Sequence, residues 1–126
     1  MLVEKRQLGR TGLSVSSIGL GCVTFGREID AEQSYRVMDH AIERGITLFD
    51  TAEAYAAGAS ETVVGEWLKR SGKRDAIVLA TKASPPLGLR VEEAAEASLR
   101  RLQTDVIDVY QVHQWDAETP LEETME

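Results

Sequence analysis

The 126-residue sequence predicts an α/β fold in which parallel strands alternate with helices. Short apolar runs alternate with longer segments of helical periodicity along the chain. The runs "ITLF" (46–49) and "IVLA" (77–80) are apolar throughout, which is typical of strands buried on both faces. The predicted strands end at Gly21, Asp50, Lys82 and His113, each about 30 residues after the last, which is the length of one strand-helix unit.

The N-terminal segment predicts a small β-hairpin that precedes the first parallel strand. The stretch "GRTG" (9–12) places two glycines between short segments that can pair. The stretch "SSIGLG" (16–21) follows as the first strand, and the other strands are predicted at 46–50, 76–82 and 106–113. We expect the hairpin to cover another part of the fold.

Three helices are predicted between these strands. In the first, within 29–45, Asp30 can form a capping box with Gln33, and Gly45 ends the helix. The second runs from Ser60 to Gly72, and the third covers 91–105. Each carries a stripe that should pack on the sheet, namely Ser34, Val37, Met38, Ala41 and Ile42 in the first, Val63, Val64, Trp67 and Leu68 in the second, and Ala94, Ala95, Leu99 and Leu102 in the third.

Charge and composition argue against several classes of function. The 14 Lys and Arg against 21 Asp and Glu leave a net charge of −7, which repels nucleic-acid phosphates. No stretch reaches the roughly 18 apolar residues that a membrane span needs, so we expect no membrane partner and a cytoplasmic location. The single cysteine, Cys22, cannot form an internal disulfide, and His40 and His113 lie far apart in the sequence, so we expect no metal site.

Two architectures compete for such a repeat. A doubly wound dinucleotide-binding sheet would have G-x-G-x-x-G after its first strand, but "GLGCVT" (19–24) has Thr24 in place of the third glycine. In a (β/α)8 barrel, catalytic groups lie at the C-terminal ends of several strands. Because Asp50, Lys82 and His113 end three successive strands, the sequence favours a TIM barrel.

These three residues and Tyr55 would form a site suited to carbonyl reduction. Lysine is rarely buried unless it is paired, so Asp50 is expected to pair with Lys82. The ammonium would stabilise the phenolate that forms when the neutral phenol of Tyr55 donates its proton to a carbonyl oxygen. A neutral His113 would donate a second hydrogen bond to that oxygen. Since no side chain delivers hydride, a nicotinamide cofactor is required.

The motifs that carry these residues resemble the signatures of the aldo-keto reductase family. They are "DTAEAY" (50–55), "ATK" (80–82) and "DVYQVHQWD" (108–116), and the resemblance spans nearly the whole chain. It implies an NADPH/NADP+-dependent reductase of aldehydes or ketones on a TIM barrel. It further implies a catalytic tetrad of Asp50, Tyr55, Lys82 and His113, with Tyr55 as the proton donor.

The same resemblance implies a cofactor site, and it places the hairpin at the bottom of the barrel. The stretch "GLGCVTFG" (19–26) resembles the family's first βα loop, so Gly21, Cys22 and Val23 are predicted to contact the cofactor together with Asp50. In the family, the contacts to the adenosine phosphate come from the second half of the barrel. A preference for NADPH over NADH is therefore not predicted from this chain.

The sequence also predicts the environments of three further side chains. Trp115 follows His113 at the predicted barrel mouth and should line a substrate pocket with Tyr55 and His113. Cys22 is expected to be a small buried hydrophobic residue, and His40, off the apolar stripe of its helix, to be solvated.

The length predicts that residues 1–126 form the N-terminal half of such a barrel. A full barrel takes about 250 residues, whereas this chain accounts for the hairpin, four strands and three complete helices. Thr119, Pro120 and Glu122 predict the start of a fourth helix, with proline at its first position. We therefore expect this chain to be inactive alone. Two alternatives stay open: a non-catalytic binding subunit, like the potassium-channel β-subunits that the segment also resembles, and a half-barrel that self-associates through open sheet edges.

Overall fold

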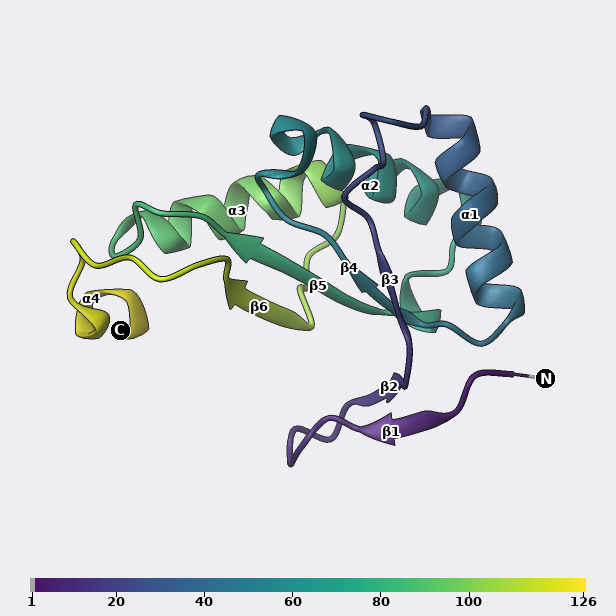
Figure 1. The fold of residues 1–126 in the computed structure, drawn as a ribbon, viewed down its shortest axis with the longest axis horizontal. Coiled ribbons are helices and arrows are strands. Elements are labelled where there is room, and N and C mark those ends of the chain that lie inside the picture. The colour runs from purple at the N-terminus through teal and green to yellow at the C-terminus, as the bar shows by residue number, and fades with distance from the viewer. Residues whose placement is uncertain (1) are drawn as a thin grey trace.

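A computed structural model describes residues 2–126, which form a two-stranded hairpin and a four-stranded parallel sheet with helices on one side (Figure 1). The strands are β1 (Lys5–Gln7) and β2 (Ser14–Ser16) in the hairpin, and β3 (Gly19–Gly21), β4 (Leu48–Asp50), β5 (Val78–Ala83) and β6 (Val109–Val112) in the sheet. The sheet has the order β3-β4-β5-β6, and all its pairings are parallel. The predicted α/β class is therefore confirmed.

One long helix occupies each connection between consecutive strands of the sheet. These helices are α1 (Ala31–Glu43), α2 (Ala59–Ser71) and α3 (Arg90–Leu102), and a short helix α4 (Leu121–Met125) follows β6. Two 3-10 helices, η1 (Tyr55–Gly58) and η2 (Arg74–Ala76), were not predicted, because a single turn is too short to show a periodic pattern. Nowhere in residues 2–126 does a helix have both the length and the apolar character needed to cross a membrane.

The helix ends largely follow the predicted signals. Asp30 and Gln33 form the predicted capping box, with the Gln33 N–H donating to Asp30 Oδ1 at 2.8 Å. Gly72 adopts the left-handed conformation at the end of α2, with φ of 66°. Thr119, in contrast, does not cap α4, because its hydroxyl donates to Asp116 Oδ2 at 2.7 Å and Pro120 precedes the first helical residue.

The predicted first strand is wrong at its N-terminal end. Ser16 belongs to the hairpin, where it pairs with Lys5, and the parallel strand begins only at Gly19. The Ser16 hydroxyl accepts hydrogen bonds from the N–H groups of Thr47 and Leu48, at 3.0 and 3.1 Å. These bonds attach the hairpin to the start of β4, at the amino end of the sheet.

The hydrophobic core lies between the sheet and the three long helices. Its largest members include Phe49 of β4 and Trp67 of α2, whose ring centroids are 5.4 Å apart. The predicted stripes of α1 and α2 face this core except for Val37, which is 39% exposed. On α3 only Leu102 belongs to this core, and Ala94 is buried in a second, smaller cluster with Ala83 and Leu87. Ala95 and Leu99 are only half-buried, so the predicted α3 stripe is wrong at these two positions.

The opposite face of the sheet is hollow. Because side chains alternate along a strand, Phe49 points toward the helices while its neighbours Leu48 and Asp50 point away from them. A cavity of about 460 Å³ lies on this side, lined by Leu8, Gly19, Gly21, Leu48, Asp50, Ala80, Val109 and Gln111. The hollow face is the inner surface that a closed barrel would have.

Helices α2 and α3 approach each other closely at Gly65. A Cβ atom at this position would lie 2.3 Å from the carbonyl oxygen of Arg101 and 2.8 Å from the Cα of Leu102. Both are backbone atoms, so the clash could be relieved only by moving α3. Glycine is therefore required at this position for α2 and α3 to pack at the observed separation.

We expect Gly65→Ala to destabilise the protein, because the added methyl group forces α2 and α3 apart. The cost should be about 1–3 kcal/mol, as for other overpacked positions. Urea denaturation can measure it, with Lys69→Ala as a control on the exposed side of α2 that should change the free energy of unfolding by about 0.5 kcal/mol or less. Equal stabilities of the two variants would show that α3 shifts without cost.

Candidate active site

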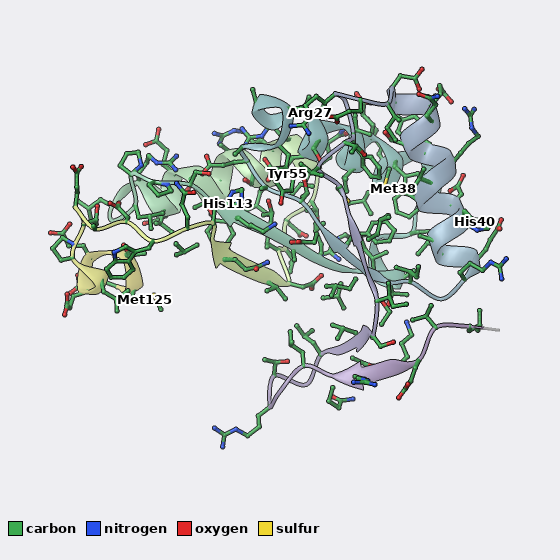
Figure 2. The ribbon with its side chains drawn as sticks, in the orientation of Figure 1. Arg27, Met38, His40, Tyr55, His113 and Met125 are labelled. Carbon is green, nitrogen blue, oxygen red and sulfur yellow. The ribbon has the colours of Figure 1, made fainter. Side chains whose placement is uncertain are left out.

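The structure brings Asp50, Tyr55, Lys82 and His113 together at the carboxyl end of the sheet. Asp50 ends β4, Lys82 lies next to the end of β5, and His113 directly follows β6. Parallel strands place their carboxyl ends at one edge, so these side chains converge there. Tyr55 joins them from the first position of η1. Figure 2 shows Tyr55 and His113 close together in this region, away from His40 on α1.

Lys82 connects this group through three hydrogen bonds. Its Nζ donates to Asp50 Oδ1 at 2.9 Å, to the carbonyl oxygen of Thr51 at 2.8 Å and to the Tyr55 hydroxyl at 3.3 Å. An ammonium group has three donors, and all three are used here. The rings of Tyr55 and His113 meet edge to face, with centroids 5.6 Å apart and an interplanar angle of 87°. The tyrosine thus lies between a fixed cation and an imidazole.

The two partners of the ion pair differ in their exposure. The Lys82 side chain is only 11% exposed, whereas that of Asp50 is 40% exposed. Water therefore reaches Asp50 and screens the pair, so its contribution to stability should resemble that of a surface ion pair, about 1 kcal/mol or less. We infer that the pair serves to orient Lys82.

Further contacts near the site were not predicted. Gln111 of β6 lies with its Nε2 atom 3.5 Å from Asp50 Oδ1, and the Ser84 hydroxyl lies 3.5 Å from Nδ1 of His113. The backbone N–H of His113 donates to the carbonyl oxygen of Ala83 at 2.8 Å and fixes the start of the His113 segment against β5. The alternation along β6 could have revealed Gln111, because it lies two residues before His113 and so on the same face.

Two acidic residues on either side of Tyr55 form ion pairs that the sequence analysis also missed. Glu53 accepts hydrogen bonds from Arg90 Nη2 at 2.8 Å and from the Ser84 N–H at 2.6 Å. Burial alone would raise the pKa of the Glu53 carboxyl, but the hydrogen bonds from Arg90 and Ser84 outweigh burial and hold this pKa below its ordinary value of 4.5.

Glu61 is fully buried at the start of α2. Its carboxylate lies 2.7 Å from Arg101 Nη2 and accepts a hydrogen bond from the Thr81 hydroxyl at 2.7 Å. The sequence does contain a signal for this site, because Glu61 falls on the helical stripe of Val64 and Leu68, where an acid requires a partner. The identity of that partner is not visible in the local pattern.

The residues predicted to contact a cofactor lie beside the tetrad but differ in accessibility. Gly21 lines the inner cavity, and Val23 is 37% exposed. Cys22 is fully buried in the core, as expected, and burial, reinforced by the charge of Asp50, raises the pKa of its thiol to about 12. The N–H of Cys22 donates to the carbonyl oxygen of Asp50 and its carbonyl oxygen accepts from the Ser60 hydroxyl, so Cys22 offers a ligand no exposed atom. Cofactor contact by the predicted residues stays a prediction.

Trp115 does not line the cavity that Asp50 lines. It is 76% exposed and borders a cavity of about 280 Å³ with Leu87 and with Leu121 of α4. Its role in substrate binding stays a prediction. His40 is 65% exposed on α1, as expected. Within residues 2–126, no cluster of three or more His, Cys, Asp or Glu is arranged to hold a metal ion.

Comparisons with known proteins agree on one relationship. A family model described as "Aldo/keto reductase family" matches residues 17–126. The uncharacterized oxidoreductase YrpG of Bacillus subtilis is 40% identical over 143 residues, an alignment that covers 98% of this chain and 44% of YrpG.

Solved structures give the same picture. The holo form of the aldo-keto reductase AKR11C1 from Bacillus halodurans matches with a TM-score of 0.87 and 41% identity, covering 97% of this chain and 44% of that one. An aldo-keto reductase from Klebsiella pneumoniae in complex with NADPH matches with a TM-score of 0.83 and 37% identity, covering 99% of this chain and 44% of that one. The chain thus spans less than half of the length of these relatives.

The lowered pKa of Glu53 predicts a pH-dependent contribution to stability. Unfolded Glu53 titrates near 4.5 and folded Glu53 below this value, so the stabilisation is fully present above pH 4.5 and is lost as the pH falls through the folded pKa. The difference in free energy of unfolding between the unmodified protein and Glu53→Gln should therefore be constant above pH 4.5 and shrink below it. Glu96→Gln on the exposed side of α3 is the control, and its difference should stay near zero. A Glu53→Gln difference that does not vary with pH would contradict this ion pair.

Proposed function

Because the chain belongs to the aldo/keto reductase family, we propose that it supplies the proton-transfer site of an NADPH-dependent reductase of aldehydes or ketones. The observation that carries this proposal is the contact of the Tyr55 hydroxyl with Lys82 Nζ at 3.3 Å, beside the ring of His113. The family resemblance predicted from the sequence is confirmed. The roles of the four residues are our proposal.

Tyr55 is the proposed proton donor. As negative charge develops on a carbonyl oxygen, the phenol gives up its proton, and the Lys82 ammonium stabilises the charge that this transfer leaves on the phenol oxygen. Lys82 can do this without reorganising, because Asp50 and the carbonyl oxygen of Thr51 already hold its other two donors. A fixed cation at this position costs no reorientation when the proton moves.

His113 is proposed to orient the carbonyl group. Its ring stands edge-on to Tyr55, and the Ser84 hydroxyl lies on the Nδ1 side, so Nε2 is the ring nitrogen left for a substrate oxygen. Two donors, Tyr55 on η1 and His113 after β6, would then converge on one oxygen, as in other sites that stabilise a developing oxyanion.

The inner face of the sheet is compatible with the nicotinamide end of NADPH, which would supply the hydride when bound. A Cβ atom at Gly21 would have no neighbour within 4 Å, so the backbone at this position is open to the cavity that Asp50 and Gln111 also line. We propose that Gly21, Val23 and Asp50 hold this end of the cofactor. The Klebsiella pneumoniae relative, solved with NADPH, supports this choice of cofactor.

We further propose that residues 1–126 correspond to the first part of the reductase barrel and are inactive alone. The chain spans 44% of the length of these relatives and contains all four proposed catalytic residues. Activity then depends on cofactor contacts from segments that the relatives have in addition. A non-catalytic binding role is the alternative, because a binding subunit can retain the same side chains.

Tyr55→Phe tests the proton donor. We would join this chain to the remainder of the Klebsiella pneumoniae relative and measure NADPH oxidation with a panel of aldehydes and ketones. Turnover should fall by about 10²–10⁴-fold, as for the loss of a general acid, with NADPH affinity unchanged. Tyr35→Phe makes the same chemical change on α1 and should leave turnover intact. If both variants turn over equally, Tyr55 is not the acid, and a chimera that binds NADPH but reduces nothing would favour the binding role.

A second proposal concerns the 126-residue chain alone. Strands β3 and β6 form the two edges of the sheet, and their backbone groups are open to pairing. We expect the isolated chain to self-associate through these edges, which multi-angle light scattering over a concentration series would detect. A monodisperse monomer at every concentration would contradict this expectation.

A further inference from the structure

The segment that carries Tyr55 is attached to α3 at both of its ends. Before the tyrosine, Glu53 pairs with Arg90 Nη2 at 2.8 Å. After it, Glu61 pairs with Arg101 Nη2 at 2.7 Å. Both acids are largely shielded from water, with side chains 17% and 0% exposed. Tyr55 therefore lies between two anchored carboxylates.

The spacing of the two arginines explains how one helix reaches both ends. Arg90 and Arg101 are separated by about three helical turns at 3.6 residues per turn, so they project from the same face of α3. They lie about 16 Å apart along the helix axis, at 1.5 Å per residue. A straight helix thus presents two guanidinium groups to one short segment.

The backbone between the two anchors is in an unfavourable conformation. Ala56, Ala57 and Gly58 follow Tyr55 with φ angles of 51°, 53° and 96°. Only glycine adopts this left-handed region without a steric cost, so two successive alanines there must be held by their surroundings. Strained backbone of this kind persists only where the rest of the structure imposes it.

Arg101 lies directly against this turn. A Cβ atom at Gly58 would be 3.0 Å from Cδ of Arg101 and 3.1 Å from its Nε. The carboxylate that binds Arg101 also accepts a hydrogen bond from the hydroxyl of Thr81, the residue before Lys82. Glu61 and Arg101 therefore connect the turn after Tyr55 to the strand that carries its proposed cationic partner.

Arg90 makes the corresponding connection at the other end. It donates to Glu53 and to the carbonyl oxygens of Ser84 and Pro86, the latter at 2.7 Å. The same Glu53 carboxylate accepts the Ser84 N–H, and the Ser84 hydroxyl faces His113. The second anchor thus joins the segment before Tyr55 to the loop beside the histidine.

We propose that Arg90 and Arg101 are positioning residues that hold the left-handed turn 56–58 and thereby fix the Tyr55 hydroxyl against Lys82. They touch neither substrate nor cofactor and act through Glu53 and Glu61. Their effect on turnover rests on the proposed function, whereas their effect on the turn is a property of the chain that can be measured without catalysis.

The test of the turn uses NMR of the full chain. Arg101→Met would leave the Glu61 carboxylate buried without its cationic partner, so the paired variant Glu61→Gln/Arg101→Met is measured beside it, together with Glu53→Gln/Arg90→Met. Tyrosine is labelled with 13C at Cζ, and Tyr55→Phe assigns the Tyr55 signal among the three tyrosines. We expect the Tyr55 signal to move toward that of unfolded tyrosine in each paired variant. Amide exchange of Ala57 should accelerate about tenfold or more, while that of Leu79 in the core stays within about twofold.

Two further variants separate positioning from a general loss of stability. Arg100→Met removes an exposed neighbour on α3 and should change neither the Tyr55 13C signal nor the amide exchange of Ala57. Adding Ala56→Gly and Ala57→Gly to Glu61→Gln/Arg101→Met relieves the left-handed strain and should return the Tyr55 signal toward its original position. An unchanged Tyr55 signal in both paired variants, equal acceleration at Ala57 and Leu79, or a glycine pair that restores nothing would overturn the proposal.

A catalytic measurement on the chimera completes the test. The paired variants should lower kcat by about 10- to 100-fold, the scale for a misplaced reacting group, with KM changed by less than about twofold. A displaced Tyr55 signal with unchanged kcat would contradict the proposed role of Tyr55 but not the role of the arginines in the turn. An undisplaced signal with lowered kcat would overturn the arginine proposal alone.

Discussion

The site depends on the three hydrogen bonds that hold the Lys82 ammonium. They are possible because of the register between β4 and β5, in which Asp50 lies opposite Ala80. Lys82 is two residues further along β5 and therefore on the same face, where its long side chain reaches back to Asp50. A shift of one residue would turn Lys82 toward the helices. The chemistry of the site is thus a consequence of strand pairing.

The helices position the part of the site that the sheet does not. Asp50, Lys82 and His113 are positioned by strands, but Tyr55 lies on a short turn with left-handed alanines and has no strand to support it. Burial of Glu61 would be costly without a partner, and Arg101 and Thr81 together satisfy its carboxylate. Among the described residues, every buried side-chain nitrogen or oxygen has a hydrogen-bond partner. The buried charge of Glu61 therefore connects α2 to α3 and β5.

Membership of the aldo/keto reductase family places this arrangement in a longer architecture. The chain spans 44% of the length of the relative from Bacillus halodurans, yet all four proposed catalytic residues lie within it. The helices bury one face of the sheet, while its inner face remains hollow between the edge strands β3 and β6. The proposed catalytic residues are thus concentrated in one continuous part of the sequence, at the ends of neighbouring strands and on the turn before α2.

Local patterns in the sequence were sufficient for the α/β class, the capping box of α1, the glycine at the end of α2 and the convergence of three strand ends. These features depend on periodicity and on residues a few positions apart. The left-handed turn after Tyr55 and the partners of Glu53 and Glu61 were not visible in this way, because those partners lie 37 and 40 residues further along the chain. The packing of α3 against α2, set by the close approach at Gly65, brings them into contact. Ion pairs of this range exist only once the helices are in place, since a charged side chain carries no local mark of which distant residue will face it.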